Sequence, residues 1–91
     1  MSAHRLRISG RVQGVGYRDW LVAQAEAMGI AGWVRNTRDG GVEALLSGEA
    51  AGVAELLRAC RRGPRGAEVV EIVEDLAEPP AEPGFRRLPT A

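Results

Sequence analysis

Residues 4–28 read HRLRISGRVQGVGYRDWLVAQAEAM, and the spacing of their apolar side chains changes partway along. Residues 4–12 alternate between apolar and polar, which predicts a half-buried strand. In residues 18–28 the apolar positions recur every three or four residues, which predicts a helix. Gly14 and Gly16 lie between the two segments and suit a tight turn. The stretch therefore predicts a strand, a loop and a helix in succession.

The next predicted elements are a β-hairpin and a second helix. Residues 31–37 and 42–47 are predicted strands, and the Asp39-Gly40 pair between them is a hairpin-turn signal. Beyond them, apolar residues recur at helical spacing until Gly63-Pro64, which predicts a helix that ends there. These apolar positions are Val53, Leu56, Leu57 and Cys60.

Two further strands are predicted toward the C-terminus. Residues 67–76 are rich in β-branched side chains, and the interrupted alternation between Val69 and Ile72 predicts a bulge. Residues 85–88 could form a short edge strand that Pro89 cuts short, before a frayed tail.

The predicted order is βαββαβ with a possible last strand, which is typical of the α+β class. It indicates a ferredoxin-like sandwich, with two helices on one face of an antiparallel sheet of four to five strands. We expect a single domain over residues 1–91, with its core in about 4–77. Domains of this fold serve as enzymes, metal carriers, RNA binders and regulatory modules, so the function must be inferred from the sites.

Composition excludes several classes of function. The single cysteine, Cys60, can form neither an internal disulfide nor a structural zinc site by itself. No apolar run is long enough for a membrane span and no signal peptide is recognisable, so a cytoplasmic protein with no membrane association is expected. A net charge of zero argues against nucleic-acid binding. Residues 1–38 hold six arginines and two acids, giving +4, whereas residues 39–91 hold six arginines and ten acids, giving −4.

The glycine-containing stretch of residues 10–18, GRVQGVGYR, predicts a binding site for an anion. A strand that runs through glycines into a helix presents backbone N–H groups, and the helix dipole adds positive potential. Arg18 at the helix entrance could bind phosphate oxygens with its planar guanidinium. On the local pattern alone, a tight turn with a surface arginine explains the stretch equally well. The Gly-Lys-Ser/Thr of a P-loop and the third glycine of a dinucleotide fingerprint are both missing.

Three blocks of the sequence resemble the acylphosphatase family. They are residues 10–18, GRVQGVGYR; residues 32–36, GWVRN, followed by Asp39-Gly40 and Val42-Glu43; and Gly63-Pro64 with Ala67 and Val69. The resemblance implies hydrolysis of an acyl phosphate to a carboxylate and inorganic phosphate, without a metal or other cofactor. It also implies that Arg18 and Asn36 are catalytic, with Asn36 positioning the attacking water. The implied phosphate-binding residues are Gln13, Gly14, Val15, Gly16, Tyr17 and Arg18.

Other polar and aromatic residues have simpler interpretations. Trp33 and Arg35 alternate with Val34 and Asn36, so they are expected to cover the far face of the sheet. Tyr17 and Trp20 are expected to pack around the first helix. His4 shares the apolar side of its strand and is interpreted as a structural histidine rather than a base.

Two functions from other classes compete with the enzyme. An RNA-recognition module has the same element order, but it stacks bases on sheet aromatics, and only Trp33 is a good candidate here. A non-catalytic phosphate-sensing module would use the same loop without turnover. We expect a monomer, because the predicted sheet edge is short and the tail is rich in proline.

Overall fold

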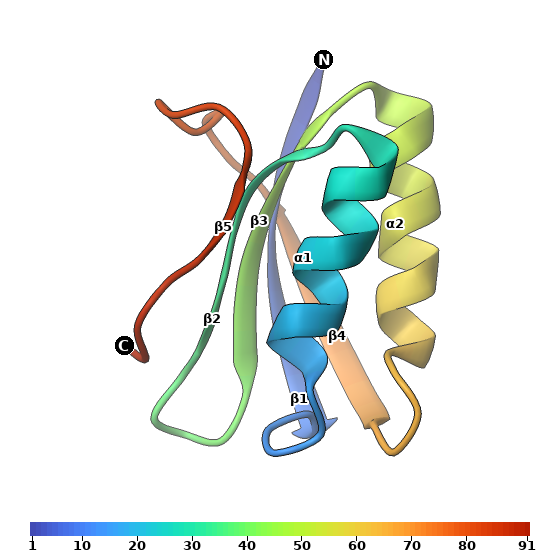
Figure 1. Cartoon of the computed structure of the whole chain (residues 1–91), viewed down its shortest axis with the longest axis vertical. Coiled ribbons are helices and arrows are strands. Elements are labelled where there is room, and N and C mark those ends of the chain that lie inside the picture. The colour runs from blue at the N-terminus through green and yellow to red at the C-terminus, as the bar shows by residue number, and fades with distance from the viewer.

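The computed structural model describes residues 1–91 and contains seven regular elements (Figure 1). In chain order they are β1 (Ser2–Arg11), α1 (Tyr17–Met28), β2 (Ala31–Asn36), β3 (Val42–Gly48), α2 (Ala50–Arg62), β4 (Glu68–Leu76) and β5 (Phe85–Arg87). This order confirms the predicted βαββαβ arrangement with a short last strand.

The strands form one five-stranded sheet in the order β4-β1-β3-β2-β5. The pairs β4–β1, β1–β3 and β3–β2 are antiparallel, whereas β5 runs parallel to β2. The sheet is therefore mixed rather than wholly antiparallel. β4 ends at the end of the sheet where β2 begins. The chain enters β5 from that same end, so β5 runs in the same direction as β2.

The predicted bulge lies where β4 pairs with β1. Ser9 is opposite Glu71 and Gly10 is opposite Val69, so Val70 is the additional residue. Gly10 has a φ of 122°, and a Cβ atom there would lie 2.1 Å from the Glu68 carbonyl oxygen. Glycine is required at this position because the backbone of β4 occupies the space of a side chain.

Both helices pack on the same face of the sheet and enclose the core with it (Figure 1). Alternate residues of β1 and β3, such as Leu6 and Leu46, are fully buried there. Leu21 of α1 and Leu56 of α2 meet them in the same cluster. The core thus arises from period-2 strands and amphipathic helices, as the sequence pattern predicts.

The C-terminal tail is more ordered than a frayed end. Leu88 donates its N–H to the Val34 carbonyl at 2.8 Å, and Ala91 donates to the Asn36 carbonyl at 3.1 Å. The Ala91 carbonyl accepts from Arg38 N–H at 3.1 Å. The expectation of a frayed tail is wrong because β2 offers its outer backbone groups to the tail beyond the end of β5.

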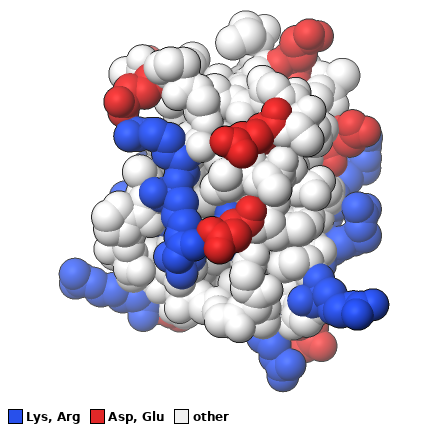
Figure 2. All heavy atoms as spheres, in the orientation of Figure 1, with Lys and Arg blue, Asp and Glu red and all other residues white.

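Charge is distributed unevenly along the molecule. Figure 2 shows arginine side chains mostly toward the end that carries the loop after β1, and acidic side chains mostly toward the opposite end. Both parts of the sequence contribute arginines to the end that carries this loop, because Arg61 and Arg62 lie in the last turn of α2. None of the helices is long and apolar enough to span a membrane.

Candidate functional site

Residues 13–16 form the loop that leads from β1 into α1. Gly14 and Gly16 adopt left-handed φ angles of 75° and 78°, and a Cβ atom on either would meet nothing within 4 Å. The backbone conformation, not a lack of space, therefore favours glycine here. None of the backbone N–H groups of this loop donates a hydrogen bond within the protein. Gly16 caps α1 without any side-chain hydrogen bond, so the loop and the helix start leave a series of N–H donors free for an anion.

Tyr17, the first residue of α1, anchors the end of the loop in the core. Its hydroxyl donates to the Cys60 carbonyl oxygen near the end of α2 at 2.7 Å, and its ring meets Trp20 edge-on with centroids 5.3 Å apart. Burial raises the pKa of the Tyr17 phenol well above its ordinary value, so the hydroxyl stays a neutral donor. The expectation that Tyr17 packs around the first helix is confirmed, and its side chain is buried in the core. Only its backbone N–H is left for a bound anion.

Gln13, the first residue of the loop, is bound through its side chain to the β2–β3 hairpin. Its Nε2 atom donates to the carbonyl oxygens of Thr37 and Gly41, both at 2.8 Å. These bonds occupy the side chain, so the backbone N–H is the group of Gln13 that remains for phosphate. Sequence reasoning missed them because they join residues 24 and 28 positions apart.

Arg18 lies half-buried in the first turn of α1 and forms no ion pair with a carboxylate. The acidic residue beside it, Asp19, is exposed and pairs instead with Arg87 of β5. That pair also links β5 to α1. Arg18 therefore keeps an uncompensated positive charge at the start of a helix, where the helix dipole also favours an anion.

Asn36 is the last residue of β2 and shares a face with buried Val34. Its side-chain oxygen Oδ1 is buried and accepts no hydrogen bond within the protein. Buried polar atoms nearly always have a partner, and an ordered water is the usual one where protein groups do not supply it. Asn36 thus offers a free acceptor in a fixed position.

These groups gather at one end of the sheet. β1 ends where the loop begins and β2 ends at Asn36, both at the lower end in Figure 1. Gln13 of the loop is bonded to Thr37, the residue directly after Asn36. The structure therefore brings the loop and Asn36, predicted from separate motifs, to the same end of the molecule.

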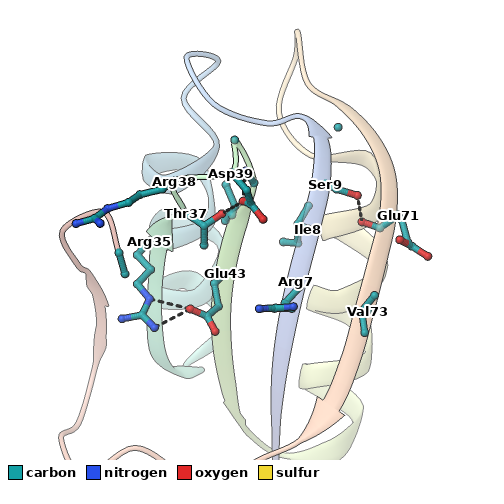
Figure 3. Close-up of a pocket in the computed structure, with 15 residues that line it drawn as sticks. Arg7, Ile8, Ser9, Arg35, Thr37, Arg38, Asp39, Glu43, Glu71 and Val73 are labelled. Carbon is teal, nitrogen blue, oxygen red and sulfur yellow. Dashed lines mark hydrogen bonds and ion pairs between the residues drawn. The ribbon is translucent and has the colours of Figure 1, made fainter.

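The far face of the sheet carries a separate cleft of about 740 Å³ (Figure 3). Arg35 lies beside it, with Nε and Nη2 at 2.8 and 2.7 Å from one carboxylate oxygen of Glu43, and with its guanidinium 4.7 Å from the centre of the Trp33 ring. The expectation that Trp33 and Arg35 cover this face is confirmed. Neither residues 13–18 nor Asn36 line the cleft, so it is distinct from the loop site.

His4 lies near the start of β1, far from the loop. Its Nδ1 atom is 2.7 Å from a carboxylate oxygen of Glu74 in β4. A strand rises about 3.3 Å per residue, so the seven steps from His4 to Arg11 span roughly 23 Å. His4 therefore links β1 to β4 and lies too far from the loop to take part in the site.

The fold and the site together define a ferredoxin-like α+β protein with free backbone N–H groups and an unpaired arginine at one end of its sheet. No group of three or more His, Cys, Asp or Glu side chains is placed to hold a metal ion.

Comparison with known proteins identifies the family. A family model described as Acylphosphatase matches residues 4–87. An acylphosphatase of Acidiphilium cryptum is 61% identical over 90 residues, which cover 99% of either chain. This chain belongs to the acylphosphatase family, and it is a hydrolase that acts on acyl phosphates.

Solved structures agree with the family assignment. The crystal structure of an acylphosphatase from Bacillus subtilis matches with a TM-score of 0.90 at 30% identity, over 97% of this chain and 99% of that one. An acylphosphatase structure from Coxiella burnetii also matches with a TM-score of 0.90, at 29% identity over 96% and 92% of the two chains. The fold class inferred from the sequence is thereby confirmed.

Proposed function

We propose that the loop of residues 13–18 holds the phosphate group of the acyl phosphate, and that Arg18 and Asn36 are the catalytic residues. In this proposal the free N–H groups of residues 13–17 and the guanidinium of Arg18 bind the phosphate oxygens. Asn36 orients the water that attacks phosphorus. The observation that carries the proposal is the buried, unpartnered Oδ1 of Asn36 at the same end of the sheet as the loop.

The reaction needs little more than these groups. The water oxygen forms a bond to phosphorus while the bond from phosphorus to the acyl oxygen breaks, and the carboxylate leaves with the electron pair. Because the conjugate acid of that carboxylate has a pKa of roughly 4, no general acid is required. A phosphate oxygen takes the proton of the attacking water. Phosphoryl transfer depends mainly on positioning and charge stabilisation, which the loop, Arg18 and Asn36 supply.

An asparagine suits the water-orienting role better than a carboxylate. Its Oδ1 accepts a hydrogen from the water and its Nδ2 remains a donor, while the side chain stays uncharged beside an anionic substrate. An aspartate at position 36 would repel the phosphate group. The proposed role therefore depends on an amide and not on a base.

Hydrolysis of benzoyl phosphate in the presence of a metal chelator tests the proposal. Asn36→Ala is expected to lower kcat by about 100-fold or more with little change in inhibition by inorganic phosphate, because it removes the water's acceptor. Arg18→Ala is expected to lower kcat at least as far and to weaken phosphate inhibition as well. Arg58→Ala, an exposed arginine of α2, is the matched control and should behave as wild type.

Three results would contradict the proposal. Undiminished turnover by Asn36→Ala would remove Asn36 from the reaction. Loss of wild-type activity in the chelator would place a metal in the mechanism. A folded wild-type protein that bound phosphate but did not hydrolyse benzoyl phosphate would favour the phosphate-sensing alternative.

We further propose that the enzyme acts in the cytoplasm as a monomer, on a small-molecule acyl phosphate. The lone cysteine, Cys60, is a buried thiol that requires no oxidising compartment. The outer edge of β4 carries acidic side chains that disfavour pairing with a second copy.

A further inference from the structure

Gln13 is the connection between the two halves of the proposed active site. The phosphate loop belongs to the β1–α1 connection, whereas Asn36 belongs to the β2–β3 hairpin. The hydrogen bonds from the Gln13 side chain to Thr37 and Gly41 are the ones that join loop residues 13–16 to hairpin residues 36–41.

The two acceptors of Gln13 are the ends of the hairpin turn. Thr37 donates its backbone N–H to the Gly41 carbonyl at 2.9 Å, which closes the turn. Gly41 in turn donates to the Asp39 carboxylate at 3.1 Å. The turn is thus internally bonded, and Gln13 holds it at both ends with the two hydrogens of one amide group.

This contact requires a primary amide at position 13. Both acceptors are carbonyl oxygens, so the side chain must present two N–H donors in one plane. An ionised glutamate has the same shape, but its carboxylate oxygens would lie against the carbonyl oxygens of Thr37 and Gly41 and repel them. A methionine has a similar length and would form neither bond.

We propose that Gln13 is a positioning residue that sets the distance between the bound phosphate and the water held by Asn36. The inference rests on the proposed roles of the loop and of Asn36. Thr37 follows Asn36 directly, so a shift of the hairpin relative to the loop moves the water relative to phosphorus. A change in this distance should lower kcat without weakening the binding of phosphate, because the loop alone binds the phosphate.

A double-mutant cycle with Gln13→Met and Asn36→Ala tests the inference, using benzoyl phosphate hydrolysis and inhibition by inorganic phosphate. Gln13→Met alone should lower kcat by about 10- to 100-fold, with KM and the phosphate inhibition constant within about threefold of wild type. In the Asn36→Ala background the same substitution should change kcat less than about threefold, because the water is no longer held there. A merely structural residue would lower kcat by the same factor in both backgrounds.

Gln13→Glu gives a second, independent readout. Its carboxylate should repel the two carbonyl oxygens, whereas the protonated acid can donate to one of them. The activity of this variant relative to wild type should therefore rise as the pH is lowered through the carboxyl pKa. Gln24→Glu, on α1, is the matched control and should show no such rise.

The outcomes separate this inference from the proposed function. Absence of wild-type turnover would overturn the proposed function and the inference with it. Wild-type activity that falls with Asn36→Ala but not with Gln13→Met would overturn the inference alone. Equal losses in both backgrounds, or a loss of phosphate affinity in Gln13→Met, would also overturn it. If neither Gln13 variant folds by circular dichroism, Gln13 is a structural residue and the inference is wrong.

Discussion

Tyr17 and Cys60 link the end of the loop of residues 13–16 to α2 through one buried hydrogen bond. Gly63, just after α2, has to be small because a Cβ atom there would lie 2.8 Å from the Tyr17 ring. The loop is thus held at both ends, by Tyr17 in the core and by Gln13 at the hairpin. A loop held in this way can keep its N–H groups oriented without substrate, which lowers the cost of binding an anion.

At the residue scale, this buried pair predicts a loss of stability at alkaline pH. Burial raises the pKa of the Cys60 thiol from 9.0 to about 11 and raises that of the Tyr17 phenol above its ordinary 10.0. The folded protein therefore keeps protons that the unfolded chain releases, so the free energy of unfolding falls as the pH rises above about 9. Cys60 alone should account for roughly 2 to 3 kcal/mol between pH 9 and 11.

Urea unfolding at pH 7, 9, 10 and 11 measures this loss. The chain has one tyrosine, one cysteine and no lysine, so few other groups titrate in this range. Cys60→Ala and Tyr17→Phe should each be less stable at pH 7, by about 1 to 2 kcal/mol, but lose less stability at high pH. Wild-type stability that is equal at pH 7 and pH 11 would contradict the prediction.

At the scale of elements, the tail after β5 supports the strand that carries Asn36. The Ala91 N–H binds the backbone carbonyl of Asn36, and the Ala91 carbonyl binds Arg38 N–H. Arg87 of β5 also pairs with Asp19 of α1. β5 and the tail that follows it therefore stabilise the positions of α1 and of the end of β2.

Ala91→Pro tests this support because proline lacks the N–H that bonds to Asn36. We expect kcat for benzoyl phosphate to fall by about 3- to 10-fold and stability to fall by about 1 kcal/mol, since one hydrogen bond is lost. Thr90→Ala, at an exposed position, serves as the control and should have full activity. An Ala91→Pro variant as active as the control would show that the tail does not support the site.

At the scale of the whole molecule, β4 leaves one edge of the sheet unpaired. Val70 and Leu76 on this strand are 76% and 84% exposed, which invites pairing with another chain. The strand also carries acidic residues along its length. They are Glu68, Glu71, Glu74 and Asp75. An antiparallel pair of two such edges would bring carboxylates together and be disfavoured.

We therefore expect a monomer of 9.7 kDa by light scattering at neutral pH, over the full concentration range used for activity measurements. Replacement of Glu71 and Glu74 by glutamine should favour association, because it removes repulsion and leaves the apolar positions in place. A wild-type species of twice the monomer mass would contradict the prediction.

Much of the fold was predictable because its signals are local. The period-2 pattern of residues 4–12 and the helical spacing of residues 18–28 depend only on neighbours in the chain. The bulge was visible as a break in alternation near Val70. The mixed sheet could not be predicted, because the direction of β5 depends on the path of residues 77–84, which have no regular structure.

The sequence by itself determined the element order, the glycine loop, the family and two candidate catalytic residues, Arg18 and Asn36. These follow from short motifs and from periodicity, which need no knowledge of distant contacts. Only the tertiary structure decided that Arg18 has no ion-pair partner, that Asn36 Oδ1 is buried without a donor, and that Gln13 binds the hairpin. The first depends on β5, whose Arg87 pairs with Asp19. The Gln13 contact depends on the sheet order, which brings the ends of β1 and β2 to the same end of the molecule although they lie far apart in the chain.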